Sequence, residues 1–212
     1  MAAVSALTGT VSKEHWDAIY ASKREDELSW FQRQATPSLE LIQRSALPPS
    51  ARVLDVGGGA SCLVDDLLAR GFEDVTVLDV SDLALAAARA RLGERATRVR
   101  WIAADVTSFE PTPGYALWHD RAVFHFLTSE AERASYVRAL ERALPSGGVA
   151  IVGTFALDGP ERCSGLPVVR YDAAGLAAAL GPSFSLVDDL RHEHVTPGGK
   201  VQAFTFVRVA RA

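Results

Sequence analysis

The sequence has little of what marks secreted or membrane-bound proteins. Its 212 residues include only two cysteines, Cys62 and Cys163, which are too few for a disulfide framework. No apolar run approaches the roughly 18 residues that a bilayer-spanning helix needs, and no basic-then-apolar leader opens the chain. These absences predict a cytoplasmic protein in a reducing compartment, with no membrane partner.

Positive charge is also scarce. The 22 lysines and arginines are outnumbered by 26 aspartates and glutamates, so the formal net charge is -4. Because no lysine and arginine cluster is available to meet a phosphate backbone, we expect no nucleic-acid partner. The hydrophobic fraction of 48% and the charged fraction of 23% are ordinary for a globular chain, and the length suits one α/β domain.

From residue 51 onward, strand-like and helix-like segments alternate, which predicts a mostly parallel sheet with helices on both faces. We expect strands at 51–56, 74–80, 99–104, 115–120 and 149–155, and helices at 61–70, 81–92, 129–144 and 172–180. Two last strand-like runs, 184–195 and 200–209, are separated only by a Thr-Pro-Gly-Gly turn. They predict a terminal hairpin that adds an antiparallel strand to the sheet.

The first 50 residues look helical and amphipathic and end at Pro48-Pro49. They carry the aromatic residues Trp16, Tyr20, Trp30 and Phe31. We expect residues 1–50 to form a helical cap or lid on a core of residues 51–212, all within one structural domain. Aromatic faces attract cations, but simple packing of a helix against the sheet explains these residues equally well.

A glycine-rich turn, Gly57-Gly58-Gly59, joins the first predicted strand to the first helix. Glycines allow the backbone to approach a ligand closely, and doubly wound folds bind ligands at the carboxyl ends of their strands. Asp79 ends the second strand, where a carboxylate can accept hydrogen bonds from both hydroxyls of a ribose. Asp105 follows the third strand and could accept one from an adenine amine. Either acid alone could be a turn residue, but together they predict an adenosine-containing ligand.

The remaining features narrow the choice of nucleotide. A dinucleotide-binding turn needs a third glycine, but Cys62 stands at that position, and the Gly-Lys-Ser/Thr of a phosphate-binding loop is absent. The first turn of the following helix also lacks a basic residue for a pyrophosphate. S-adenosylmethionine (SAM) has no phosphate, and its sulfonium tolerates nearby acids. The sequence therefore favours SAM over NAD.

These motifs resemble those of the class I SAM-dependent methyltransferases. Residues 53–59 are similar to the first motif of that family, 77–81 to the second, 104–106 to the third and 144–148 to the turn before the fifth strand, while 118–121 lie where the fourth motif closes the active site. The resemblance implies an α/β, doubly wound, seven-stranded sheet of order 3-2-1-4-5-7-6. The fourth motif lacks the Asn/Asp-Pro-Pro-Tyr pattern, which argues against adenine, cytosine or glutamine as the methyl acceptor.

The resemblance also implies a set of SAM contacts. The first motif would hold the amino-acid part of SAM, the second the ribose and the third the adenine. Asp120 would contact SAM close to its methyl group. The expected cofactor-binding residues are Asp55, Gly57, Gly58, Gly59, Asp79, Val80, Asp105, Val106, Asp120 and Trp30.

Methyl transfer from a sulfonium is an in-line displacement, which needs a positioned acceptor, exclusion of water and, for some acceptors, removal of a proton. His125, just beyond the fourth strand, is a candidate general base near neutral pH, although a structural histidine is the alternative. His119 and Arg121 are further catalytic candidates, and Arg121 could instead hold an acidic substrate or pair with Asp120. The expected substrate contacts are Tyr20, Phe31, Arg162 and Cys163.

The compact chain favours a small-molecule acceptor, such as a thiol. Two alternatives stay open: a protein-lysine N-methyltransferase, which the aromatic cap favours, and a SAM-binding protein without turnover, since no residue is an unmistakable catalyst. His192 and His194 share one face of a predicted strand, but an ordinary surface strand explains them better than a metal, and no metal is expected. The chain could be a monomer or a homodimer.

Overall fold

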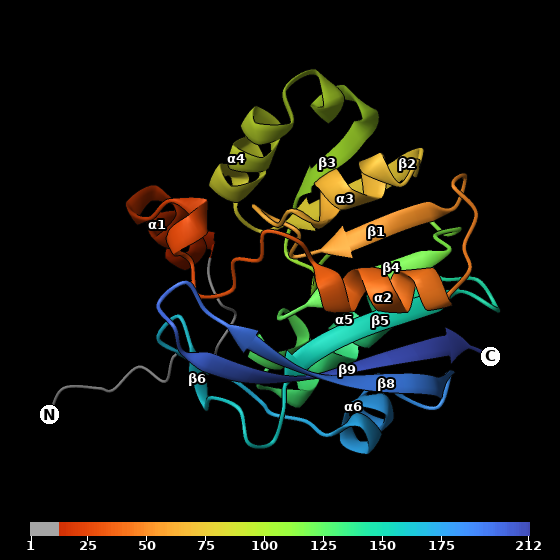
Figure 1. Ribbon diagram of the computed structural model, residues 1–212. Coiled ribbons are helices and arrows are strands. Elements are labelled where there is room, and N and C mark those ends of the chain that lie inside the picture. Colours follow the sequence, from red (N-terminus) through yellow and green to blue (C-terminus); the bar gives the residue numbers. More distant parts are fainter. Residues whose placement is uncertain (1–12) are drawn as a thin grey trace, which may run out of the picture.

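A computed structural model describes residues 13–212 and contains a seven-stranded sheet of order β3-β2-β1-β4-β5-β9-β8 (Figure 1). Strands β1 to β5 run parallel, and β9 and β8 are antiparallel additions. The strands are β1 (Arg52–Val56), β2 (Asp74–Asp79), β3 (Val99–Ala103), β4 (Leu117–Arg121), β5 (Val149–Phe155), β8 (Phe184–Val195) and β9 (Val201–Arg211). A separate two-residue pair, β6 (Arg162–Cys163) and β7 (Leu166–Pro167), precedes the last two. Since β8 and β9 are the sixth and seventh strands of the main sheet, the predicted order and fold class are confirmed.

Six α-helices connect or flank these strands in the described part of the chain: α1 (Lys13–Ser22), α2 (Thr36–Arg44), α3 (Leu63–Ala69), α4 (Asp82–Leu92), α5 (Glu130–Ala143) and α6 (Ala173–Leu180). Side-chain caps set three of their starts: Ser81 accepts from the amide of Ala84, Ser129 from Glu132, and Asp172 from Gly175. Helix α3 starts two residues later than expected, because the Ser61 hydroxyl accepts from the Leu63 amide in a turn before the helix. None of the helices in residues 13–212 is long and apolar enough to cross a bilayer.

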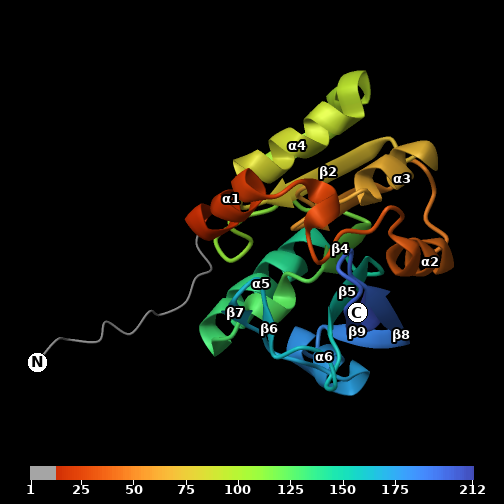
Figure 2. The ribbon, with the colours of Figure 1, turned by 60° about the vertical axis from the view of Figure 1, so that its left-hand side comes forward.

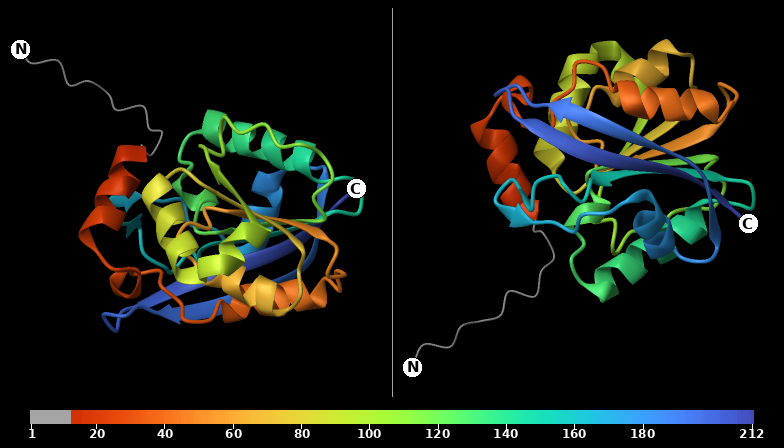
Figure 3. Two further views of the ribbon diagram at one scale, coloured as in Figure 1. Left: turned by 90° about the horizontal axis from the view of Figure 1, so that it is seen from above. Right: turned by 60° about the horizontal axis from the view of Figure 1, so that its bottom comes forward.

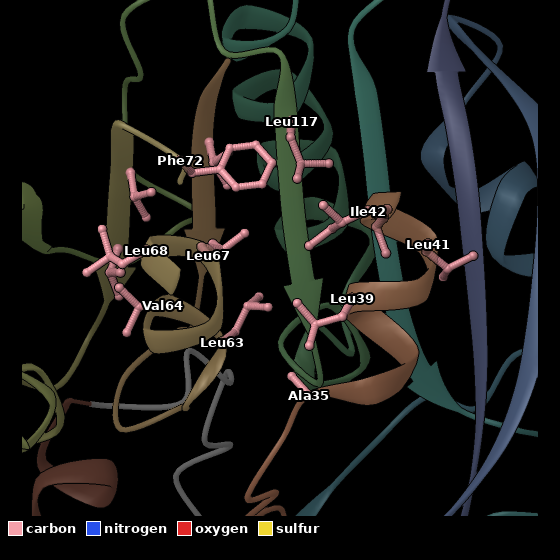
Figure 4. Close-up of a cluster of buried hydrophobic side chains, with 14 of the residues drawn as sticks. Ala35, Leu39, Leu41, Ile42, Leu63, Val64, Leu67, Leu68, Phe72 and Leu117 are labelled. Atoms are coloured by element: carbon pink, nitrogen blue, oxygen red, sulfur yellow. The ribbon is translucent and has the colours of Figure 1, made fainter. Parts of the chain in front are cut away.

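Strand side chains alternate between the two faces of the sheet, and each face has its own buried core. One core joins α2, α3 and α4 to the sheet, and Figure 4 shows the apolar side chains of α2 and α3 on the same face of the sheet as Leu117 of β4. The other core joins α5 and α6 to the opposite face. Within β4, Trp118 points into the second core and Leu117 into the first. By the same alternation Asp120 faces α5, while His119 and Arg121 face the side of α2.

The N-terminal segment divides into two parts with different surroundings. Helix α2 is part of the core, with Leu39, Leu41 and Ile42 buried. Helix α1 instead lies beside α4 at the end of the sheet where the parallel strands finish (Figures 1 and 2). The β6–β7 pair reaches the same end, as Figure 3 shows. Residues 1–12 of the expected cap lie outside the described residues.

Candidate active site

The carboxyl ends of β1, β2, β3 and β4 border the main cavity of the described residues, and α1 covers it. The cavity is lined by residues from all three expected groups: cofactor-binding, catalytic and substrate-binding. The expected residues that line it are Gly57, Asp79, Val80, Asp105, Val106, Trp30, Tyr20, Arg121 and Cys163. Those that do not line it are Asp55, Gly58, Gly59, Asp120, His119, His125, Phe31 and Arg162.

The glycine turn has no room for side chains. Gly57 has φ +66°, and a Cβ there would lie 2.1 Å from Val123 Cγ2. Gly59 has φ +35°, and its Cβ would lie 2.6 Å from Asp79 Oδ2. The amides of Gly57 and Gly58 both donate to the Leu78 carbonyl, at 2.7 and 3.2 Å. The backbone after β1 therefore passes directly beside the end of β2, and Gly57 presents backbone without a side chain to the cavity.

Beneath this turn lies a buried polar chain on the α2 side of the sheet. Asp55 and His119 are paired neighbours on β1 and β4, with Asp55 Oδ1 2.7 Å from His119 Nδ1. His119 Nε2 lies 2.7 Å from the hydroxyl of Ser38 on α2. Asp55 Oδ2 is buried without a partner among the described residues, and a Cβ on Gly58 would lie 2.5 Å from it. His119 thus uses both ring nitrogens inside the protein, whereas one oxygen of Asp55 faces the glycine turn unpaired.

The two acids expected to bind adenosine both lie at the cavity. Asp79 is 8% exposed, and its Oδ1 accepts from the Ser81 amide at 2.8 Å. Burial, with the nearby charge of Asp55, raises the pKa of Asp79 to about 7. Asp105 Oδ1 accepts from the amide and hydroxyl of Thr107, each at 2.8 Å. In each carboxylate, Oδ1 accepts hydrogen bonds from its own turn. These hydrogen bonds leave Oδ2 available to a ligand.

Asp120 is fully buried below the loop that follows β4. Its Oδ1 accepts from the Val123 amide at 2.8 Å, and its Oδ2 accepts from the Phe124 amide at 3.0 Å and the Tyr136 hydroxyl at 2.7 Å. Burial raises the pKa of Asp120 to about 6 although these hydrogen bonds act in the opposite direction. In this geometry Asp120 shapes the loop that carries Ala122, which has φ +72°.

His125 is also fully buried, in the same loop. Its Nδ1 accepts from the Phe155 amide at 3.3 Å, and its ring packs against Phe126 and Phe155. Its Nε2 is buried without a partner among the described residues. Burial and, to a smaller extent, the charge of Arg121 lower the pKa of His125 to about 3, so the imidazole is neutral.

Four aromatic side chains cover the cavity. Trp16 packs edge-to-face on Trp30 at 5.7 Å and on Phe126 at 5.2 Å, and Tyr20 does so on Trp30 at 6.1 Å between ring centroids. All four line the cavity. Burial raises the pKa of the Tyr20 hydroxyl well above its usual value, so the phenol is neutral. The result is an apolar roof with negative ring faces.

The remaining expected substrate contacts, Cys163, Phe31 and Arg162, lie in three different places. Cys163 is buried at the main cavity, and burial raises the pKa of its thiol. Phe31 lines a smaller hollow, which Arg121 and Trp30 share with the main cavity. Arg162 is exposed and donates to the Gly165 carbonyl within the β6–β7 turn.

His194 bonds to the Ser29 carbonyl at 2.7 Å, and within residues 13–212 no three His, Cys, Asp or Glu side chains converge as metal ligands.

The chain is similar in sequence to known methyltransferases. A family model described as a methyltransferase domain matches residues 53–148. Trans-aconitate 2-methyltransferase from Methylobacterium nodulans is 35% identical over 134 residues, which cover 63% of this chain and 47% of the relative. The eEF1A lysine and N-terminal methyltransferase of Mus musculus is 22% identical over 140 residues, 65% of this chain and 19% of the relative. The chain thus spans about half the length of the first relative and about a fifth of the second.

A solved structure extends the likeness to the whole fold. The 1,6-didemethyltoxoflavin-N1-methyltransferase of Burkholderia thailandensis, with bound 1,6-didemethyltoxoflavin and S-adenosylhomocysteine, superposes with a TM-score of 0.71 at 20% sequence identity. The match covers 100% of this chain and 98% of that one. Residues 53–148 thus match a methyltransferase domain, in agreement with the glycine turn and the acids at successive strand ends, and the superposition shows that the chain shares the fold of such an enzyme.

Proposed function

We propose that this chain binds SAM in the main cavity and transfers its methyl group to a small-molecule nucleophile, such as a thiol, by in-line displacement. One observation carries the proposal: the acids suited to adenosine, the aromatic roof and the Arg121–Cys163 side all line one cavity. An acceptor small enough to enter beneath the roof would meet the methyl group in an apolar space that excludes water.

Residues at the cavity and beneath the glycine turn have the chemistry that the parts of SAM require. Asp79 would accept from the ribose hydroxyls, and Asp105 beside Val106 would hold the adenine. The bare Gly57 backbone and the unpaired Asp55 Oδ2 under the glycine turn would receive the amino-acid part. When bound, SAM supplies an electrophilic methyl group on a sulfonium. The role left to the chain is to orient the two reactants and keep the site dry.

The small-molecule acceptor is supported by the roof of α1, and trans-aconitate is itself a small molecule in the name of the first relative. The alternative, a lysine side chain of a protein, is favoured by the aromatic faces at the cavity and by the name of the eEF1A relative. The third alternative is a SAM-binding protein without turnover. It is supported because His119 and His125, the two candidate catalytic histidines near the fourth strand, are buried.

A labelling experiment separates the three readings. The purified chain is incubated with methyl-labelled SAM and a cell extract divided into small-molecule and macromolecular fractions. We expect label in the small-molecule fraction, and no label with an Asp79→Ala variant that still folds. Label only in macromolecules would instead support lysine methylation. If SAM binds but neither fraction is labelled, the protein acts without turnover.

A further inference from the structure

Two contacts fix the guanidinium of Arg121: a hydrogen bond from one edge and a cation–π contact on one face. Its Nη1 donates to the Trp30 carbonyl at 2.9 Å. Its central carbon lies 4.9 Å from the centroid of the Phe204 ring, which places the cation over the aromatic face. These two contacts orient the side chain at the end of β4, where it lines both the main cavity and the smaller hollow.

The other edge of the Arg121 guanidinium, formed by Nε and Nη2, has no hydrogen-bond partner among the described residues. Both of these nitrogens are buried. No ion pair recorded within residues 13–212 includes Arg121. A buried charge without a partner is expensive, and burial lowers the pKa of Arg121 to about 10. The group still carries its charge at neutral pH.

Other arginines of this chain show what that edge binds. Arg208 places Nε 2.7 Å from Asp188 Oδ1 and Nη2 3.1 Å from Asp188 Oδ2. Arg91 likewise directs Nε and Nη2 at Asp65 Oδ2, at 3.1 and 2.9 Å. The two parallel N–H bonds of this edge match the two oxygens of a carboxylate. Arg121 lines the cavity, and its Nε–Nη2 edge has no such carboxylate partner among the described residues.

Acidic residues line the same hollows as Arg121, among them Glu132 in the main cavity and Glu25 in the smaller one, but none forms an ion pair with it within residues 13–212. His125, His192 and His194 lie close enough for its charge to lower their pKa values, after the larger effect of burial. Cys163 is the other titratable neighbour, and burial raises the pKa of its thiol, which keeps it neutral. These histidines and Cys163 therefore do not neutralise the charge of Arg121.

We propose that the Nε–Nη2 edge of Arg121 binds a carboxylate of the methyl acceptor, so that the acceptor is a small organic acid. This inference rests on the proposed function, because it assigns the substrate class of the same cavity. The second possible source of a carboxylate is the amino-acid part of SAM. The acceptor is favoured because Arg121 packs on Phe204 of β9 and lies near Cys163, whereas the adenosine acids lie at the ends of β2 and β3.

The test uses acetate as the simplest carboxylate and acetamide as its neutral counterpart. Saturation-transfer NMR of the acetate methyl group measures binding to the protein saturated with S-adenosylhomocysteine, at constant ionic strength. We expect saturable acetate binding that weakens at least tenfold in Arg121→Met and less in Arg121→Lys, with no binding of acetamide. Arg208→Met is the matched control, because its edge is already filled by Asp188, and it should bind acetate like the unchanged protein.

Each contrary outcome has its own meaning. Absent acetate binding, or equal binding by Arg121→Met, would overturn the inference. If acetate binds only to the protein without S-adenosylhomocysteine and Arg121→Met binds S-adenosylhomocysteine at least tenfold more weakly, the carboxylate belongs to the cofactor and the inference is again wrong. If the unchanged protein fails to bind S-adenosylhomocysteine, the proposed function itself fails, which calorimetry detects before any acetate is added. Thermal melts of both Arg121 variants establish that they are folded.

Discussion

Tyr136 of α5 donates its hydroxyl proton to the buried carboxylate of Asp120, 2.7 Å away. The same hydroxyl accepts from Trp118 Nε1 at 2.7 Å, so three buried side chains form one chain of hydrogen bonds. Asp120 continues it to the amides of Val123 and Phe124. This network connects α5 to the loop that forms one wall of the cavity.

Breaking the network should therefore cost stability. Asp120→Asn places an amide N–H₂ against at least one of the three donors, and Tyr136→Phe leaves Trp118 Nε1 without its acceptor. We expect each change to lower the free energy of unfolding by about 1–3 kcal/mol, measured by urea denaturation without cofactor. Tyr171→Phe, outside the network, is the control. If Asp120→Asn weakened only the binding of S-adenosylhomocysteine and left stability unchanged, Asp120 would be a cofactor contact, as the sequence suggests.

Arg91 of α4 connects the turn after the glycines, at Ala60 and Ser61, to Glu25 of the N-terminal segment. It donates to the carbonyls of Ala60 and Ser61 at 2.9 and 2.7 Å and pairs with Glu25 at 2.6 Å. Arg91→Met removes all of these bonds, so we expect the affinity for S-adenosylhomocysteine to fall by roughly tenfold, about 1.4 kcal/mol, in calorimetry. Arg95→Met is the control, because Arg95 shares the Asp65 partner but is half exposed. Equal affinities of the two variants would show that the turn needs no such support.

Asp79 is the residue on which cofactor binding should depend most directly. Asp79→Ala leaves the ribose hydroxyls unpaired in a buried site, which we expect to cost about 1–3 kcal/mol of binding free energy for SAM. Asp74→Ala, at the opposite end of β2 and paired with Arg52, removes the same charge far from the cavity. Calorimetry on both variants decides the matter: unchanged affinity in a folded Asp79→Ala protein would show that the ribose lies elsewhere.

The raised pKa of Asp79 also predicts a pH dependence. Ribose hydroxyls donate to the ionised carboxylate, and its pKa is about 7 in the free protein, so affinity for S-adenosylhomocysteine should rise as the pH increases from 6 to 8. Stability of the free protein should change in the opposite sense. The folded state keeps the Asp79 proton up to about pH 7, whereas the unfolded chain releases it near pH 4, so stability falls between these values. Asp79→Asn should remove the pH dependence of affinity, and persistence of that dependence would point to another group.

The sequence predicts the part of the site that depends on local signals. Gly57, Asp79 and Asp105 each lie at or just beyond the carboxyl end of a strand, and parallel strands bring such ends together. The structure places all three at one cavity. The order of the sheet follows from the resemblance and from the terminal hairpin, whose turn has a recognisable composition.

Contacts between distant segments could not be predicted in this way. Val123 and Phe126 line the cavity because Asp120 and Tyr136 bend the loop after β4, and that bend depends on packing against α5. Similarly, His119 meets Ser38 across 81 residues, since α2 packs into the core. A local sequence pattern does not indicate that Asp120 will contact Tyr136 or that His119 will contact Ser38.

The general-base role of His125 remains a prediction, and its geometry suggests how to test it. Because Nδ1 accepts from the Phe155 amide, the neutral ring carries its proton on Nε2 and has no free lone pair for the acceptor. With a pKa of about 3, His125 should add no limb to the pH profile of kcat between pH 6 and 8. We expect His125→Gln to keep turnover within about threefold, assayed with the small-molecule fraction that accepts label. A fall of about a hundredfold in kcat with unchanged S-adenosylhomocysteine affinity would instead establish His125 as the base, after the ring has turned toward the cavity.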